Sequence, residues 1–365
     1  MLITKEQVIE ALSHVNDPDL KKDLVTLNMI ENVAIEGNKV SFTVVLTTPA
    51  CPLKDAIEQD CRQAIAQYVS ADAEVDLTFD SKVTTRRVDK KDVLPGVKNI
   101  IAVSSGKGGV GKSTVAVNLA LALLKNGSTV GIVDADIHGP SIPLMLGIKG
   151  KRPTVQQIDG KHYIVPLEAY GLKVLSIGLL IDERQAVVWR GPMVSSALRQ
   201  FFTECIWGDL DYLILDLPPG TGDVHLTLAQ QIPITGAVVV TTPQKVALAD
   251  ARKGISMFKM EGMNIPIIGV VENMSWFTPA ELPDSKYYLF GKGGGAALAE
   301  EFDVPLLGQI PLVQSIREGG DQGNPAVLQN DATTTEAFMN FATTMERQVA
   351  ILNSKVNQTA EAPTA

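Results

Sequence analysis

The sequence has few cysteines, no excess of positive charge and no long hydrophobic run, and each absence excludes a class of protein. Three cysteines in 365 residues cannot form a disulfide framework and are typical of a reducing cytosol. A net charge of -9 argues against general binding of nucleic acid or anionic lipid, because phosphate-rich partners are held by clustered Lys and Arg. No apolar stretch approaches the roughly 18 residues of a membrane-spanning helix. Charged residues also interrupt the first ten positions, which argues against a secretory signal. We therefore expect a cytoplasmic protein that binds neither membranes nor nucleic acid.

The first 80 residues predict a small α+β domain. Thr4 and Gln7 form a capping-box pattern that opens a helix, and two strand-like segments, 27–35 and 39–48, follow with a hairpin turn between them. A second helix is expected to begin at Pro52, and a short strand near residues 74–79 completes the domain. Residues 81–95 are polar and lack an apolar period, which is typical of a linker.

The remainder of the chain predicts an α/β domain over residues 96–353. Apolar runs rich in β-branched residues alternate there with helical segments: NIIAVSS, STVGIVDAD, YLILDLPPG, GAVVVTTP, PIIGVVE and PLLGQIP. Such runs are typical of a parallel sheet that is covered by helices on both faces. The small, polar residues 354–365 predict a disordered tail.

A phosphate-binding loop follows the first of these strands. Residues 106–113 fit the pattern G-x-x-x-x-G-K-[ST] between a predicted strand and a predicted helix, where backbone N–H groups and the helix N-terminus surround a phosphate. Lys112 is expected to reach the β and γ phosphates of ATP, and Ser113 to ligate Mg²⁺. A glycine-rich turn without a ligand is the alternative. The predicted nucleotide-binding residues are Gly106, Lys107, Gly108, Gly109, Val110, Gly111, Lys112, Ser113 and Thr114.

Aspartates at the ends of two other strands are expected to complete this site. Asp216 ends the run YLILD, where a carboxylate can hold the magnesium shell, and LPPGTGD after it is typical of a nucleotide-sensing loop. Asp136 is assigned to the attacking water or the metal shell. For Asp134 a role in capping the turn stays open. His138 and His225 flank these loops, but a lone histidine there is more often structural, so neither receives a role.

Seven motifs together resemble one family. GKGGVGKST, VDADIHGPS, WRGPM, LDYLILDLPPGTGD, TTPQ, GVVENMS and FGKGGG are similar to the Mrp/ApbC family of P-loop ATPases, which are cytosolic carriers of iron–sulfur clusters. Its wider class includes MinD and ParA, and the early lysine of its deviant Walker A motif reaches the partner's nucleotide across a face-to-face homodimer. The resemblance implies this role for Lys107 and an adenine contact for Asn273; an asparagine in a strand-end turn is the alternative for Asn273.

The N-terminal domain resembles a small domain shared by iron–sulfur assembly factors, with TTPACP as its characteristic loop. Most of the carrier family has a C-x-x-C after VENMS that binds a cluster between subunits, but no cysteine follows that motif here. The remaining candidate ligand is Cys51, because a helix start favours a thiolate. A buried loop anchor is the alternative for Cys51, whereas Cys61 shares no helix face with it and Cys205 is expected in the core. One thiol per chain predicts labile binding.

The resemblance implies a homodimeric ATPase that hydrolyses ATP slowly, receives clusters from scaffold proteins and delivers them to recipient apoproteins. An ATPase of the MinD/ParA class without a cluster and a P-loop synthetase acting on a small molecule stay open. DNA partitioning and membrane positioning are disfavoured, because the C-terminal segment TTTEAFMNFATTMERQVAIL holds one Arg and two Glu. A nitrogenase-like electron donor would need cysteines near LPPGTGD, which has none.

Overall fold

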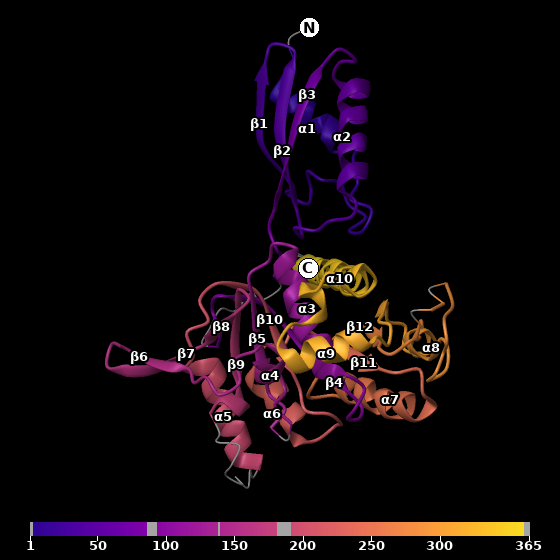
Figure 1. Ribbon diagram of the computed structural model, residues 1–365. Helices are drawn as coiled ribbons and strands as arrows, with labels where there is room; N and C mark the ends of the chain where they lie inside the picture. The colour runs from indigo at the N-terminus through magenta and orange to yellow at the C-terminus, as the bar shows by residue number, and fades with distance from the viewer. Residues whose placement is uncertain are drawn as a thin grey trace. The chain divides into compact units, whose positions relative to one another are not determined.

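The computed structural model describes residues 3–85, 93–137, 139–180, 191–279, 281–282 and 284–360. The chain divides into two compact units (Figure 1). The first unit consists of Met1–Arg86 with Glu346–Ala365, and the second consists of Arg87–Met345. Among the described residues, no helix combines the length and the hydrophobicity needed to cross a membrane.

The first unit is the small α+β domain that the sequence predicts. Thr4 caps its first helix, and the capping box with Gln7 is formed as expected. Buried and partly exposed positions alternate along the strand Lys39–Leu46, and its buried side packs with both helices into one core. Its elements are α1 (Lys5–Leu12), β1 (Ile30–Glu36), β2 (Lys39–Leu46), α2 (Lys54–Tyr68) and β3 (Glu74–Ser81).

The hairpin of this unit has the predicted turn. Strands β1 and β2 are antiparallel, and Glu36 pairs with Lys39 across Gly37 and Asn38. Gly37 has a φ of 66°, a conformation that costs glycine little. Strand β3 then pairs with β2 in parallel, with helix α2 as the connection.

The C-terminal helix α10 (Ala332–Ala360) extends into the segment that the sequence predicts to be a disordered tail. Residues 354–360, expected in a disordered tail, form its last turns; residues 361–365 lie outside the described part of the chain. Once a helix has been nucleated, each further residue adds a hydrogen bond at small cost, so polar residues can extend it.

The second unit contains an eight-stranded sheet, as the alternating runs predict. The strand order is β13-β12-β11-β4-β10-β5-β9-β8, and all pairs are parallel except β8 with β9. The six predicted runs are β4 (Val97–Ser105), β5 (Val130–Asp134), β10 (Leu210–Asp216), β11 (Gly236–Thr241), β12 (Ile267–Glu272) and β13 (Leu306–Gln309).

Helices cover both faces of this sheet. On one face, Ile100 of β4 and Leu213 of β10 share a core with α5 (Gly191–Thr203), α6 (Asp223–Gln231) and α7 (Lys245–Lys259). The intervening Ile101 and Ile214 are also fully buried, because α3 (Lys112–Lys125) packs on strands β4, β5 and β10. The other helical segments are α4 (Ile142–Met145), η1 (Ile177–Leu179), α8 (Gly294–Glu301), α9 (Gln314–Gln322) and η2 (Ala326–Leu328).

Four strands lie outside the predicted runs. β8 (Leu167–Ala169) and β9 (Leu172–Ser176) extend the sheet at one edge. β6 (Thr154–Ile158) and β7 (Lys161–Val165) form a hairpin that projects from the unit (Figure 1). Every residue of β6 is exposed, so this strand carries no buried apolar period by which the sequence could reveal it.

Candidate nucleotide site

The predicted phosphate-binding loop connects β4 to α3 at the carboxyl edge of the sheet. Helix α3 begins at Lys112, and its N-cap Gly111 has a φ of 82°. Gly109 has a φ of 81°, so two glycines hold the left-handed conformations that the loop requires. The hydroxyl of Ser105 donates to the carbonyl oxygen of Lys107 at 2.9 Å and fixes the start of the loop.

The glycines of the loop differ in the space that surrounds each of them. A Cβ on Gly106 would lie 2.1 Å from the backbone carbon of Asp250, so only glycine fits there. In the part of the chain that the structure describes, no atom lies within 4 Å of a Cβ built on Gly108 or Gly109, and both residues are exposed. The closed side of the loop therefore packs against α7, while the open side can receive a phosphate.

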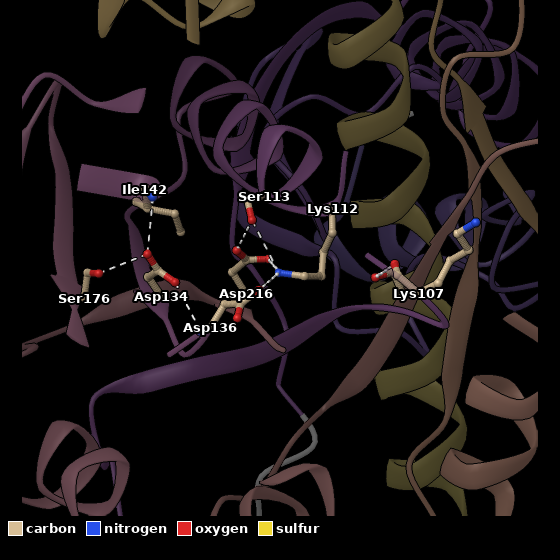
Figure 2. A network of polar contacts seen from close by, with 9 residues as sticks. Lys107, Lys112, Ser113, Asp134, Asp136, Ile142, Ser176 and Asp216 are labelled. Carbon is tan, nitrogen blue, oxygen red and sulfur yellow. Dashed lines mark hydrogen bonds and ion pairs between the residues drawn. The ribbon is translucent and has the colours of Figure 1, made fainter. Parts of the chain in front are cut away.

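Lys112 is the centre of a charged cluster (Figure 2). Its ammonium lies 2.6 Å from Asp216 Oδ1 and 3.6 Å from Asp136 Oδ2, and the hydroxyl of Ser113 donates to Asp216 Oδ2 at 2.5 Å. Asp216 is fully buried; burial raises the pKa of its carboxyl group, and the Lys112 ammonium opposes that rise. The structure thus brings together Lys112, Ser113, Asp136 and Asp216, which the sequence places up to 104 residues apart.

Asp134 anchors a turn, the alternative that the sequence left open. Its carboxylate accepts hydrogen bonds from the backbone N–H groups of Asp136 and Ile142, both at 3.2 Å, and from the Ser176 hydroxyl at 3.0 Å. Burial and the nearby charge of Asp216 raise its pKa to about 8. Asp134 is therefore occupied by its own loop, whereas Asp136 faces Lys112.

The oxygen atoms at this cluster suit a magnesium ion. A hydroxyl and a carboxylate are hard ligands, and Mg²⁺ is held by few protein groups together with phosphates and water. In the described residues, no group of three or more His, Cys, Asp or Glu forms a closed metal site. Ser113 and Asp216 therefore fit the partial coordination that a nucleotide would complete.

Lys107 belongs to the phosphate-binding loop, and Asn273 lies beside that loop. The Lys107 side chain points away from Lys112 and Asp216 (Figure 2). Asn273 follows β12, is nearly buried, and lines a pocket of about 260 Å³ beside the phosphate-binding loop. Gly111 and Thr114 line the same pocket, so a base placed there would be joined to phosphates at the loop.

Cys51 lies in the first unit in a setting that differs from the prediction. Helix α2 begins at Lys54, so Pro52 precedes it. Burial, with the charges of Asp17 and Asp19, raises the pKa of the Cys51 thiol, although the Leu53 backbone and Arg347 oppose the rise. The prediction that the helix start favours a thiolate at Cys51 is therefore wrong, because the effect of burial on the pKa outweighs that of the N–H groups near the helix.

The other two cysteines are poor ligands. Cys61 is fully buried in the core of the first unit, and Cys205 is partly exposed at the edge of the core in the second unit. Burial raises the pKa of each thiol to about 12. The prediction that Cys205 is a core residue thus holds in part only.

Two buried polar residues near the site received no role from the sequence. Glu272 ends β12, and its carboxylate accepts hydrogen bonds from the Gly295 N–H at 2.5 Å and the Gln309 amide at 2.7 Å. The sequence signal that could have identified Glu272 is an acidic residue at the end of a predicted strand. His225 is buried in α6 with Nδ1 3.3 Å from the Gly222 carbonyl oxygen, in agreement with a structural role. His138 lies outside the described residues.

Comparisons with known proteins agree with this arrangement. Residues 96–346 match the family model described as NUBPL iron-transfer P-loop NTPase, and residues 5–77 match that of an iron-sulfur cluster assembly protein. An iron-sulfur cluster carrier protein of Synechocystis is 50% identical over 96% of this chain and 98% of its own. A carrier protein of Escherichia coli K12 is 47% identical over 89% of this chain and 86% of its own.

A solved structure is similar as well. A nucleotide-binding protein of Archaeoglobus fulgidus, in complex with ADP, has a TM-score of 0.58 and 36% identity, covering 67% of this chain and 93% of that chain. With the family model matched from residue 96 to residue 346 around the Lys112 site, the chain belongs to the NUBPL iron-transfer P-loop NTPases, the Mrp/ApbC family, and carries an iron-sulfur cluster assembly domain before it.

Proposed function

We propose that this protein binds ATP with Mg²⁺, hydrolyses it slowly, and carries an iron–sulfur cluster to recipient apoproteins. The convergence of Lys112, Ser113 and Asp216 at one loop supports the nucleotide part. Relatives that match nearly the whole chain are iron-sulfur cluster carrier proteins, which supports the cluster as cargo. In this proposal residues 1–80 form the domain with the cluster-binding thiol, residues 81–95 form a linker, and residues 96–353 form the ATPase domain.

Each residue at the site has a distinct task. Lys112 exchanges carboxylate partners for the β and γ phosphates, because an ammonium is a mobile point charge on a flexible stem. Ser113 and Asp216 hold Mg²⁺, which neutralises phosphate charge when bound. Asp136 orients the attacking water or a water of the metal shell. Asn273 contacts the base from the wall of the adjoining pocket.

Lys107 needs a second copy of the chain to act on phosphate. Its side chain points away from the cluster, which is the geometry expected of a cation that serves a neighbouring nucleotide (Figure 2). We infer that the protein is a homodimer in which each Lys107 reaches the other subunit's phosphates and stabilises charge in the transition state.

The cluster is the cargo in this proposal, and Cys51 is its ligand from this chain. One thiol cannot complete a four-thiolate set, so the second subunit, a small thiol, a scaffold protein or the recipient supplies the other ligands. Binding is consequently labile. The three free cysteines are compatible with a cytoplasmic setting.

A nucleotide-dependent protein without cluster is the second candidate. Residues 274–293, where most of the family has C-x-x-C, contain no cysteine, and this observation favours a MinD/ParA-like ATPase or a small-molecule synthetase.

Anaerobic reconstitution separates the two candidates. The full chain is incubated with iron, sulfide and a thiol, desalted, and iron and sulfide are counted per dimer, while phosphate release from ATP is measured in parallel. Retained iron and sulfide that fall in Cys51→Ser and persist in Cys205→Ser support the carrier. Hydrolysis without retained cluster supports the second candidate, and absence of ATP binding overturns both.

A further inference from the structure

The side chain of Asn273 is bonded to the phosphate-binding loop. Its amide Nδ2 donates to the carbonyl oxygen of Val110 at 2.8 Å. Asn273 is 6% exposed and Val110 is 3% exposed, so water has little access to this bond. A buried carbonyl without a partner is costly, and Asn273 satisfies this one across 163 positions of sequence.

Loop and asparagine fit each other closely. A Cβ on Gly111 would lie 2.2 Å from Asn273 Nδ2, a separation that real Cβ atoms do not show. Gly111 also has a φ of 82°, which disfavours side chains independently. The absence of a side chain at Gly111 thus lets the amide reach the loop just where helix α3 begins.

Hydrogen bonds hold the backbone around Asn273 in place. Its backbone N–H donates to the Thr241 carbonyl oxygen at 2.8 Å, which holds it to β11. The N–H of Ser275 donates to Ile310 at 2.9 Å, and the Ser275 hydroxyl donates to the Glu272 carbonyl at 2.7 Å. Glu272, which is 1% exposed, binds α8 and β13 through its carboxylate. Residues on both sides of Asn273 are therefore fixed by neighbouring elements.

We propose that Asn273 is a positioning residue for the phosphate-binding loop, in addition to the base contact, and this inference rests on the proposed ATP binding. A primary amide has two N–H donors and one acceptor oxygen, and the bond to Val110 uses one donor. Asn273 holds the loop in the conformation that receives phosphate, so its loss weakens binding even of a phosphate chain that carries no base.

Inorganic tripolyphosphate and adenosine test the two roles separately by calorimetry on the full chain. A residue that contacts only the base affects adenosine, whereas a residue that positions the loop affects tripolyphosphate. We expect Asn273→Ala to bind tripolyphosphate about tenfold more weakly, a loss of about 1.4 kcal/mol, because the loop is no longer held in the conformation that receives phosphate. Asn273→Leu has a similar volume and no hydrogen-bond donor, so we expect it to bind tripolyphosphate as weakly as Asn273→Ala. It is the variant to measure if the alanine variant does not fold.

Asn99→Ala is the matched control. Asn99 is fully buried in β4, and its amide also donates to a backbone carbonyl, that of Asp211, at 3.3 Å. We expect it to lower stability while leaving tripolyphosphate affinity unchanged. If both Asn273 variants bind tripolyphosphate as wild type does, the positioning role is overturned and the proposed function stands. If the wild type binds neither tripolyphosphate nor ATP, the proposed function itself fails.

Discussion

The ammonium of Lys112 lies 2.6 Å from the carboxylate of Asp216. The lysine that is expected to bind phosphate is therefore paired with the aspartate that is expected to bind magnesium. Both side chains are buried. A buried carboxylate that loses its cation keeps the cost of desolvation, and the same ion pair thus links nucleotide binding to the stability of the second unit.

Replacing Lys112 with alanine is expected to abolish ATP hydrolysis. The change removes the charge that reaches the phosphates, and losses of one such group reduce turnover by about 100-fold or more. Phosphate release at saturating ATP measures it. Lys125→Ala is the control, because Lys125 ends the same helix and bonds the Val327 carbonyl oxygen instead. Wild-type turnover in Lys112→Ala would exclude the phosphate role of this loop.

Lys107→Ala is expected to bind ATP and to lose hydrolysis by roughly 1,000-fold, as expected for a cation supplied by a partner subunit. Binding is retained because Lys112 stays in place. Binding and turnover are measured by nucleotide titration and phosphate release.

Mixing Lys107→Ala with Lys112→Ala should recover activity, since one site of the mixed dimer then has both lysines. Wild-type activity per chain that does not fall at high dilution, where a dimer dissociates, would contradict action between subunits.

Cys51→Ser is expected to abolish cluster transfer while ATP hydrolysis stays near the wild-type rate. Burial raises the pKa of this thiol, and a thiol must lose its proton to bind iron, so loading of the wild type should increase between pH 7 and pH 9. Transfer is followed by the absorbance of an apo-ferredoxin recipient. Cys205→Ser is the control thiol; equal transfer by Cys51→Ser and wild type would show that Cys51 is not an essential ligand.

His225 is expected to make the second unit less stable in mild acid. Burial lowers its pKa below the ordinary value of 6.5, and its buried Nε2 has no hydrogen-bond partner among the described residues. The unfolded chain therefore binds the proton more readily, so stability is complete above about pH 6.5 and declines as the pH falls below it. Thermal unfolding between pH 8 and pH 5 measures the decline.

In His225→Gln this decline should be smaller than in the wild type. His162→Gln is the matched control, because His162 lies exposed in β7 of the same unit. Equal pH dependence in the wild type and His225→Gln would refute the contribution of His225.

The sequence by itself determined six strands of the second unit, the phosphate-binding loop and the aspartates that end two strands. These signals are local: an apolar run, glycine spacing and an acid at a strand end each occupy fewer than about 15 residues. It also predicted the hairpin turn at Gly37 and the capping box at Thr4, because such patterns depend only on neighbouring residues.

Only the tertiary structure decided which of Asp134 and Asp136 faces Lys112, how the eight strands are ordered, and that Asn273 supports Val110. It also decided the pKa of Cys51, since that pKa depends on burial and on charges from distant parts of the chain such as Arg347. The physical reason is common to all four. Sheet order brings together groups separated by many residues, and hydrogen bonding and desolvation act on distance in space, which a pattern along the chain does not contain.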